Sequence, residues 1–206
     1  MVVRTVQSQQ TTPSPIMGSG FADPGPLGLA AFAMTTFFLS SVNAGWLPVS
    51  VEGVVLGLAL FYGGIVQVFA GMWEFVKGNT FGAVAFSSYG AFWLAFWYLV
   101  AHVDLSEATA ADRSKGVGFF LLGWTIFTLI MLVCTYWING LLMTVFGFLS
   151  LTFIALTLGD LFAVSGLVKL GGYLGLVTAA LAWYGAMAGV LNSVAKRNIL
   201  PTFPRG

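Results

Sequence analysis

Residues 22–36, ADPGPLGLAAFAMTT, join a turn-forming segment to a long apolar run. Proline lacks a backbone N–H, so a helix tolerates it only before or within the first turn. Pro24 and Pro26 therefore predict that a helix begins here. The apolar residues that follow Gly28 predict that this helix continues into a membrane.

The composition of the whole chain is that of a membrane protein. Of its 206 residues, 58% are hydrophobic and only 7% are charged, which lies outside the usual balance of soluble domains. The net charge of +1, without a basic and aromatic patch, gives no reason to expect nucleic acid as a partner. Residues 1–21 lack the continuous apolar core of a signal peptide and are predicted to form a disordered tail.

Six apolar segments are long enough to cross a bilayer as helices. A hydrocarbon core of about 30 Å needs roughly 20 helical residues, and the apolar residues run continuously, unlike the alternation of barrel strands. The predicted spans are 27–48, 53–76, 81–102, 116–138, 141–161 and 168–191. We therefore expect an all-α membrane protein, with six transmembrane helices in one domain over residues 22–192 and a C-terminal tail over residues 193–206.

The basic residues predict the orientation of these spans. Six crossings place both termini on one side of the membrane, and that side contains five of the eight Lys and Arg residues. Basic residues accumulate in cytoplasmic segments, so both termini are predicted to be cytoplasmic.

The sequence lacks the residue patterns of several catalytic and cofactor sites. His102 is the only histidine and Cys134 the only cysteine, which excludes a bis-histidine haem, a multi-histidine metal site and an intrachain disulfide within one chain. Neither a G-x-S-x-G motif nor a phosphate-binding Gly-rich loop is present. We therefore expect no enzyme, no cofactor and no metal. The two remaining classes are a transport protein and a structural or signalling membrane protein.

Polar residues inside the spans indicate where the helices meet partners or water. On the first span Phe32, Thr36, Ser40 and Asn43 follow one another at steps of four, four and three, so they share one helix face. On the second span Gln67 projects from a stripe of small residues. Its amide either bonds to a neighbouring helix or lines a path through the protein.

Further polar groups lie on the third span and near the span ends. Tyr89 follows Ser87 and Ser88, so its hydroxyl could meet a solute or a partner helix. Glu74 and Asp160 lie near span ends. They are either hydrated interfacial carboxylates or groups with a proton-linked role.

Several motifs in order resemble one known family. ADPGPLGL is similar to the Asn-Pro-Ala-Pro-Leu-Gly-Leu signature of the acetate uptake transporter family, which includes bacterial succinate–acetate permeases and yeast acetate/ammonia transport proteins. Asp23 stands where the family usually has Asn. The similarity covers about residues 22–192 and continues through FYGGIVQ (61–67), FAGMWEF (69–75), GNTFG (78–82), AFSSYGAFW (85–93), FTL (127–129) and WY (183–184).

The resemblance implies a plasma-membrane transporter of acetate, and of succinate in some members. It implies a homohexamer in which the six helices of each subunit enclose an hourglass-shaped path. Within that path, the family's hydrophobic constriction falls on Phe32, Tyr89 and Leu149. Export of ammonium or ammonia is the alternative within transport, since some relatives are linked to it.

A carboxylate needs help to pass an apolar constriction. At pH 7 a carboxyl with a pKa of about 4.3 is protonated in roughly one molecule in several hundred, so passage requires either hydrogen-bond donors or proton uptake with the substrate. The candidate donors are Thr35, Thr36, Asn43, Gln67, Ser87, Ser88 and the Tyr89 hydroxyl. The expected movement is either channel-like or proton-coupled.

The opening stretch is expected to form a vestibule in front of the constriction. Its residues are Asp23, Pro24, Pro26, Leu27 and Gly28. Asp23 is either a helix cap or, like Glu74, a proton-linked group.

Overall fold

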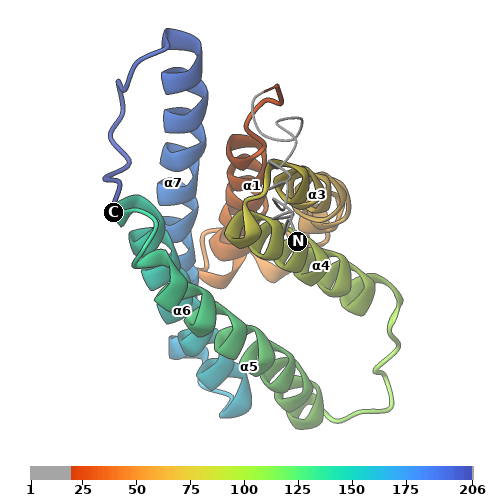
Figure 1. Cartoon of the computed structure of the whole chain (residues 1–206). Coiled ribbons are helices and arrows are strands. Elements are labelled where there is room, and N and C mark those ends of the chain that lie inside the picture. The colour runs from red at the N-terminus through yellow and green to blue at the C-terminus, as the bar shows by residue number, and fades with distance from the viewer. Residues whose placement is uncertain (1–19, 206) are drawn as a thin grey trace, which may run out of the picture.

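The computed structural model describes residues 20–205, and the regular structure within them is helical (Figure 1). Six of these helices are long and apolar enough to cross a membrane, which confirms the predicted fold class. They are α1 (Gly25–Asn43), a composite helix over Val49–Lys77, α4 (Thr80–His102), α5 (Ala110–Thr135), α6 (Gly140–Leu161) and α7 (Ser165–Ala195). Most of the tail predicted over residues 1–21 lies outside the described residues.

The first helix, α1, begins at Gly25, as the two prolines indicate. The Asp23 Oδ1 atom accepts a hydrogen bond from the Gly25 backbone N–H at 3.1 Å. The helix ends at Asn43, before the expected residue 48, because Gly45 adopts a φ of 80° and breaks the helical path. The Trp46 N–H closes the end by donating to the Ser41 carbonyl at 2.9 Å.

The second crossing is a composite of four pieces. It consists of η2 (Val49–Val51), α2 (Gly53–Gly57), the π-helical segment η3 (Leu58–Val66) and α3 (Gln67–Lys77). A π-helix of nine residues is rare, and such segments often occur at functional sites. At Gly63 the helix approaches α1 so closely that an added Cβ would lie 2.5 Å from Thr35 Oγ1. The next residue after the π-helical segment is Gln67.

The helix α1 lies between α7 and α3 in the bundle (Figure 1). Other close pairs are α5 with α6, α6 with α7, and α3 with α4. The buried core between them is rich in aromatic rings, with Phe92 packed against Phe120, Trp124 and Phe153. This core surrounds the two cavities described below.

The segment after α7 packs back onto the bundle, beyond the simple tail that the sequence predicted (Figure 1). Tyr184 Oη donates to the Pro201 carbonyl at 3.0 Å. The first backbone N–H of α6, at Gly140, donates to the Phe203 carbonyl at 2.8 Å. The Leu141 N–H donates to the Thr202 carbonyl at 3.3 Å, so this segment satisfies donors that a helix start leaves unpaired.

Candidate functional site

Two cavities in the described part of the chain meet at the same pair of side chains. Cavity 1 has a volume of about 230 Å³ and includes Asp23 and Gly25, at the start of α1. Cavity 2 has a volume of about 380 Å³ and includes Asn43, at the end of α1. Phe32 and Leu149 line both cavities. The cavities therefore approach each other from opposite ends of the bundle.

The junction of the cavities is apolar and closely packed. Phe32, Tyr89 and Leu149 are 6%, 2% and 3% exposed, and all three line cavity 1. The rings of Phe32 and Tyr89 are 5.7 Å apart between centroids. We call these three residues the junction. The structure brings together the residues on which the resemblance placed a constriction.

The Tyr89 hydroxyl bonds to a partner helix. Its Oη lies 2.9 Å from Thr128 Oγ1 on α5, and the Thr128 hydroxyl donates to the Trp124 carbonyl at 2.7 Å. The Tyr89 hydroxyl is therefore the donor to Thr128. Because the hydroxyl is used in this bond, Tyr89 contributes its aromatic ring to the lining of cavity 1. Thr128 did not emerge as a site residue from the sequence, although it lies within the FTL motif.

Besides Tyr89, three of the predicted donors line the cavities. Gln67 lines cavity 1 and is fully buried, and neither its Nε2 nor its Oε1 has a hydrogen-bond partner within residues 20–205. Thr36 lines cavity 2, and its buried Oγ1 likewise has no partner among the described residues. Asn43 also lines cavity 2. An unpaired buried amide costs about 1–3 kcal/mol, so Gln67 is a strong candidate to bind a solute.

The other three predicted donors, Thr35, Ser87 and Ser88, line neither cavity. Thr35 lies about 100° around the helix from Thr36, where its Oγ1 donates to the Ala31 carbonyl at 3.0 Å and packs against Gly63. Ser87 packs closely against Gly71 of α3. Thr35 and Ser87 therefore pack against the second crossing helix, and the buried Ser87 Oγ, like Thr36 Oγ1, has no hydrogen-bond partner within residues 20–205.

Part of the predicted vestibule, Pro26 and Gly28, is a packing element. Pro24, Pro26, Leu27 and Gly28 line neither cavity. A Cβ added at Gly189 of α7 would lie 2.5 Å from Pro26, and one added at Gly28 would lie 2.6 Å from Phe86 of α4. The start of α1 is thus packed closely against two other helices, and of the five predicted residues only Asp23 reaches cavity 1.

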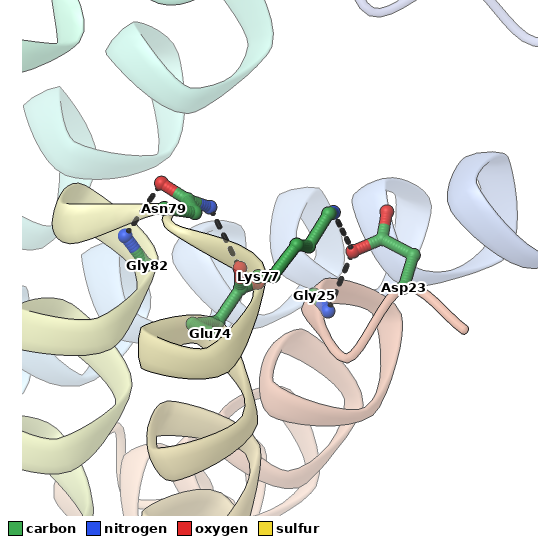
Figure 2. Close-up of polar contacts among 6 residues, drawn as sticks. All are labelled: Asp23, Gly25, Glu74, Lys77, Asn79 and Gly82. Atoms are coloured by element: carbon green, nitrogen blue, oxygen red, sulfur yellow. Dashed lines mark hydrogen bonds and ion pairs between the residues drawn. The ribbon is translucent and has the colours of Figure 1, made fainter. Parts of the chain in front are cut away.

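A polar cluster surrounds the mouth of cavity 1 (Figure 2). The Lys77 ammonium donates to Asp23 Oδ1 at 2.7 Å. Asn79 Nδ2 donates to Glu74 Oε2 at 2.9 Å, and Asn79 Oδ1 accepts from the Gly82 N–H at 3.1 Å, which caps α4. Glu74 is 1% exposed and lines cavity 1, with Asn79 as its hydrogen-bond partner. Lys77 and Asn79 were not predicted as site residues, although the GNTFG motif includes Asn79.

The mouth of cavity 2 also contains charged residues, namely Glu52, Arg113 and Asp160. The Arg113 Nη1 atom donates to the Leu105 carbonyl at 3.1 Å. Over residues 20–205 no three His, Cys, Asp or Glu side chains are grouped in a way that could hold a metal ion.

Comparison with known protein families gives one match over nearly the whole chain. The sequence pattern of the GPR1/FUN34/yaaH family matches residues 5–204. Among individual proteins, the Acetate permease A of Emericella nidulans is 43% identical over 195 residues, which are 88% of this chain and 65% of that protein. The Ammonia transport outward protein 2 of Saccharomyces cerevisiae is 41% identical over 176 residues, 82% of this chain and 62% of its own length.

A bacterial relative matches over almost its full length. The Succinate-acetate/proton symporter SatP of Escherichia coli is 39% identical over 180 residues, 87% of this chain and 94% of that protein. The solved structure of the bacterial acetate channel SatP superimposes with a TM-score of 0.81 at 39% identity, covering 89% of this chain and 99% of that one. The chain thus spans less than two thirds of the two fungal relatives but nearly all of the bacterial one.

Proposed function

Since the chain belongs to the GPR1/FUN34/yaaH family, we propose that it is a membrane transporter of acetate and related small carboxylates such as succinate. The resemblance that its sequence motifs indicate is confirmed by the family match and by the relatives named as acetate permease, symporter and acetate channel. Those names also agree with the expectation that the chain is not an enzyme. The observation that supports transport most directly is that cavities from opposite ends of the bundle share Phe32 and Leu149.

The substrate path runs from cavity 1 through the junction into cavity 2, with the profile of an hourglass. An apolar junction excludes a hydrated anion unless nearby donors replace its water. Gln67 offers an unpaired amide on the cavity 1 side, and Thr36 offers an unpaired hydroxyl on the cavity 2 side. The rings and methyl groups of Phe32, Tyr89 and Leu149 then set the width that a substrate must pass.

Orientation and assembly are part of the same proposal. The predicted cytoplasmic termini make cavity 1 the cytoplasmic mouth of a plasma-membrane protein. Large apolar side chains such as Phe61, Phe69 and Trp73 remain 64%, 59% and 51% exposed in the single chain, and lipid and neighbouring subunits of a homohexamer would cover them. The mass of the purified protein in detergent measures the subunit number.

Ammonium or ammonia export is the second candidate function. Among the described residues, two acidic side chains, Asp23 and Glu74, line cavity 1 beside a single base, Lys77, an arrangement that a cation would also tolerate. The name of one fungal relative refers to outward ammonia transport.

Competition in reconstituted vesicles separates the two functions. Uptake of labelled acetate into proteoliposomes is measured, with protein-free vesicles subtracted because neutral acetic acid crosses lipid. Acetate transport predicts that unlabelled acetate and succinate reduce the signal and that ammonium at the same concentration and pH does not. Uptake equal to that of protein-free vesicles would contradict the proposed function.

A further inference from the structure

Three charged side chains line cavity 1 at its mouth, and they differ in their partners (Figure 2). Lys77 is the only base among the residues that line this cavity in the described part of the chain. Its Nζ donates to Asp23 Oδ1 at 2.7 Å. The Glu74 carboxylate instead accepts from the amide of Asn79. The one positive charge at this mouth is thus neutralised by Asp23.

The carboxylate of Asp23 is held by donors that would equally suit a carboxylate substrate. Its Oδ1 atom accepts from the Lys77 ammonium and from the Gly25 N–H, at 2.7 and 3.1 Å. The same cavity contains Gln67, a fully buried amide whose two polar atoms have no partner within residues 20–205. Cavity 1 therefore has an occupied carboxylate contact at its mouth and an unpaired donor among its buried residues.

We propose that the Asp23–Lys77 ion pair is an electrostatic latch that sets the affinity of cavity 1 for a carboxylate. Lys77 is the base that pairs with the substrate carboxylate and thereby determines specificity. The Asp23 carboxylate competes with the substrate for Lys77, so the ion pair must open before the substrate binds. The inference rests on the proposed transport of carboxylates. The side chains of Lys77 and Asp23 are 36% and 53% exposed, and an ion pair so accessible to water is weak enough to open and exchange partners.

The charge-removing variant Asp23→Asn tests the latch without removing the helix-start contact, because Asn keeps a side-chain oxygen for the Gly25 N–H. The KM for acetate exchange across proteoliposomes is expected to fall about two- to fivefold, the range of one exposed ion pair, while kcat changes little. Lys77→Gln is expected to raise the KM. In the Lys77→Gln background, Asp23→Asn is expected to have no further effect, because the base that it would release is absent.

Two further comparisons test that the effect is electrostatic and that it is local to cavity 1. The difference between Asp23→Asn and wild type should shrink at high ionic strength, since salt screens exposed charges. Glu107→Gln and Arg197→Gln remove one acid and one base that are exposed and line neither cavity, and both are expected to leave the KM unchanged.

Opposite KM shifts in the two single variants, lost in the double variant, support the latch. If both single variants shift the KM equally in one direction and lower the melting temperature equally, the ion pair instead stabilises the contact between α1 and α3. If Asp23→Asn still lowers the KM in the Lys77→Gln background, Asp23 acts by general repulsion of the anion and the latch is ruled out. If the wild-type protein exchanges acetate no faster than protein-free vesicles, the proposed function and the latch are both overturned. If the wild-type protein exchanges acetate and Asp23→Asn leaves the KM unchanged, only the latch is overturned.

Discussion

At the scale of single residues, Gln67 is the side chain whose surroundings most need a ligand. It is fully buried, it lines cavity 1, and it has no hydrogen-bond partner among the described residues. Interhelical packing alone would pair this amide with a neighbouring helix, which was the alternative that the sequence left open. The unpaired amide favours the role of a donor in the path.

Gln67→Leu separates that role from a structural one. Removing a donor to a charged group costs about 1.5–3 kcal/mol, so acetate transport is expected to fall about tenfold or more. The melting temperature should stay level or rise, because an apolar side chain replaces an unpaired buried amide. Flux and thermal unfolding are measured on the same preparation. A large loss of stability with normal flux per folded molecule would assign Gln67 to packing.

Tyr89 is expected to act through its ring, because its hydroxyl already donates to Thr128. Tyr89→Phe should keep acetate flux within about twofold and reduce stability by about 1 kcal/mol, the usual worth of one hydrogen bond. Thr128→Val removes the same bond from the other side and serves as the matched variant. A collapse of flux in Tyr89→Phe, but not in Thr128→Val, would mean that the hydroxyl contacts the substrate.

At the scale of helices, hydropathy predicted the number of crossings well and their ends less well. The helix α5 begins at Ala110, before the expected residue 116, because Thr109 caps it by accepting from the Asp112 N–H at 3.1 Å. Its first turns are polar, so an apolar pattern cannot detect them. The π-helical segment η3 has an ordinary apolar sequence, and no local signal distinguishes it from an α-helix.

The C-terminal segment after α7 also escaped prediction, because single polar contacts hold it and no periodic pattern of residues marks them. Asn192 is its anchor. The Asn192 Oδ1 atom accepts from the N–H groups of Ile199 and Leu200 at 2.8 and 2.9 Å, and its Nδ2 donates to the Leu200 carbonyl at 2.8 Å. Through this anchor the segment stays in reach of the first N–H groups of α6.

Asn192→Ala is therefore expected to destabilise the protein more than Asn198→Ala, which removes only the contact between the Asn192 and Asn198 side chains. The Asn192 side chain makes four hydrogen bonds, each worth about 0.5–1.5 kcal/mol, so the anchor variant should lose roughly 2–6 kcal/mol. Thermal unfolding in detergent measures both variants. Equal losses would show that Asn192 does not anchor the segment.

At the scale of the whole molecule, helical periodicity predicted which residues share one face of the path, but not which of the other candidate donors line a cavity. Helical periodicity grouped Phe32, Thr36, Ser40 and Asn43, and the structure places all four on cavity 2. Thr35 directly precedes Thr36 in the sequence, but it packs against Gly63 of η3 instead of lining a cavity. A single helix shows which residues share a face, but its neighbours decide which face meets the cavity.

The width of the junction decides which substrates can pass along the whole path, and Leu149 can probe this width because it lines both cavities. Leu149→Ala widens the junction, whereas Leu142→Ala widens cavity 1 alone and is the matched control.

The decisive measurement is the ratio of labelled lactate to labelled acetate flux in proteoliposomes. Excluding a slightly larger substrate from a tight apolar site accounts for about tenfold or more in selectivity. A path through the junction predicts that this ratio rises by about that factor in Leu149→Ala and stays at the wild-type value in Leu142→Ala. An unchanged ratio in Leu149→Ala, with normal acetate flux, would contradict a path through Phe32, Tyr89 and Leu149.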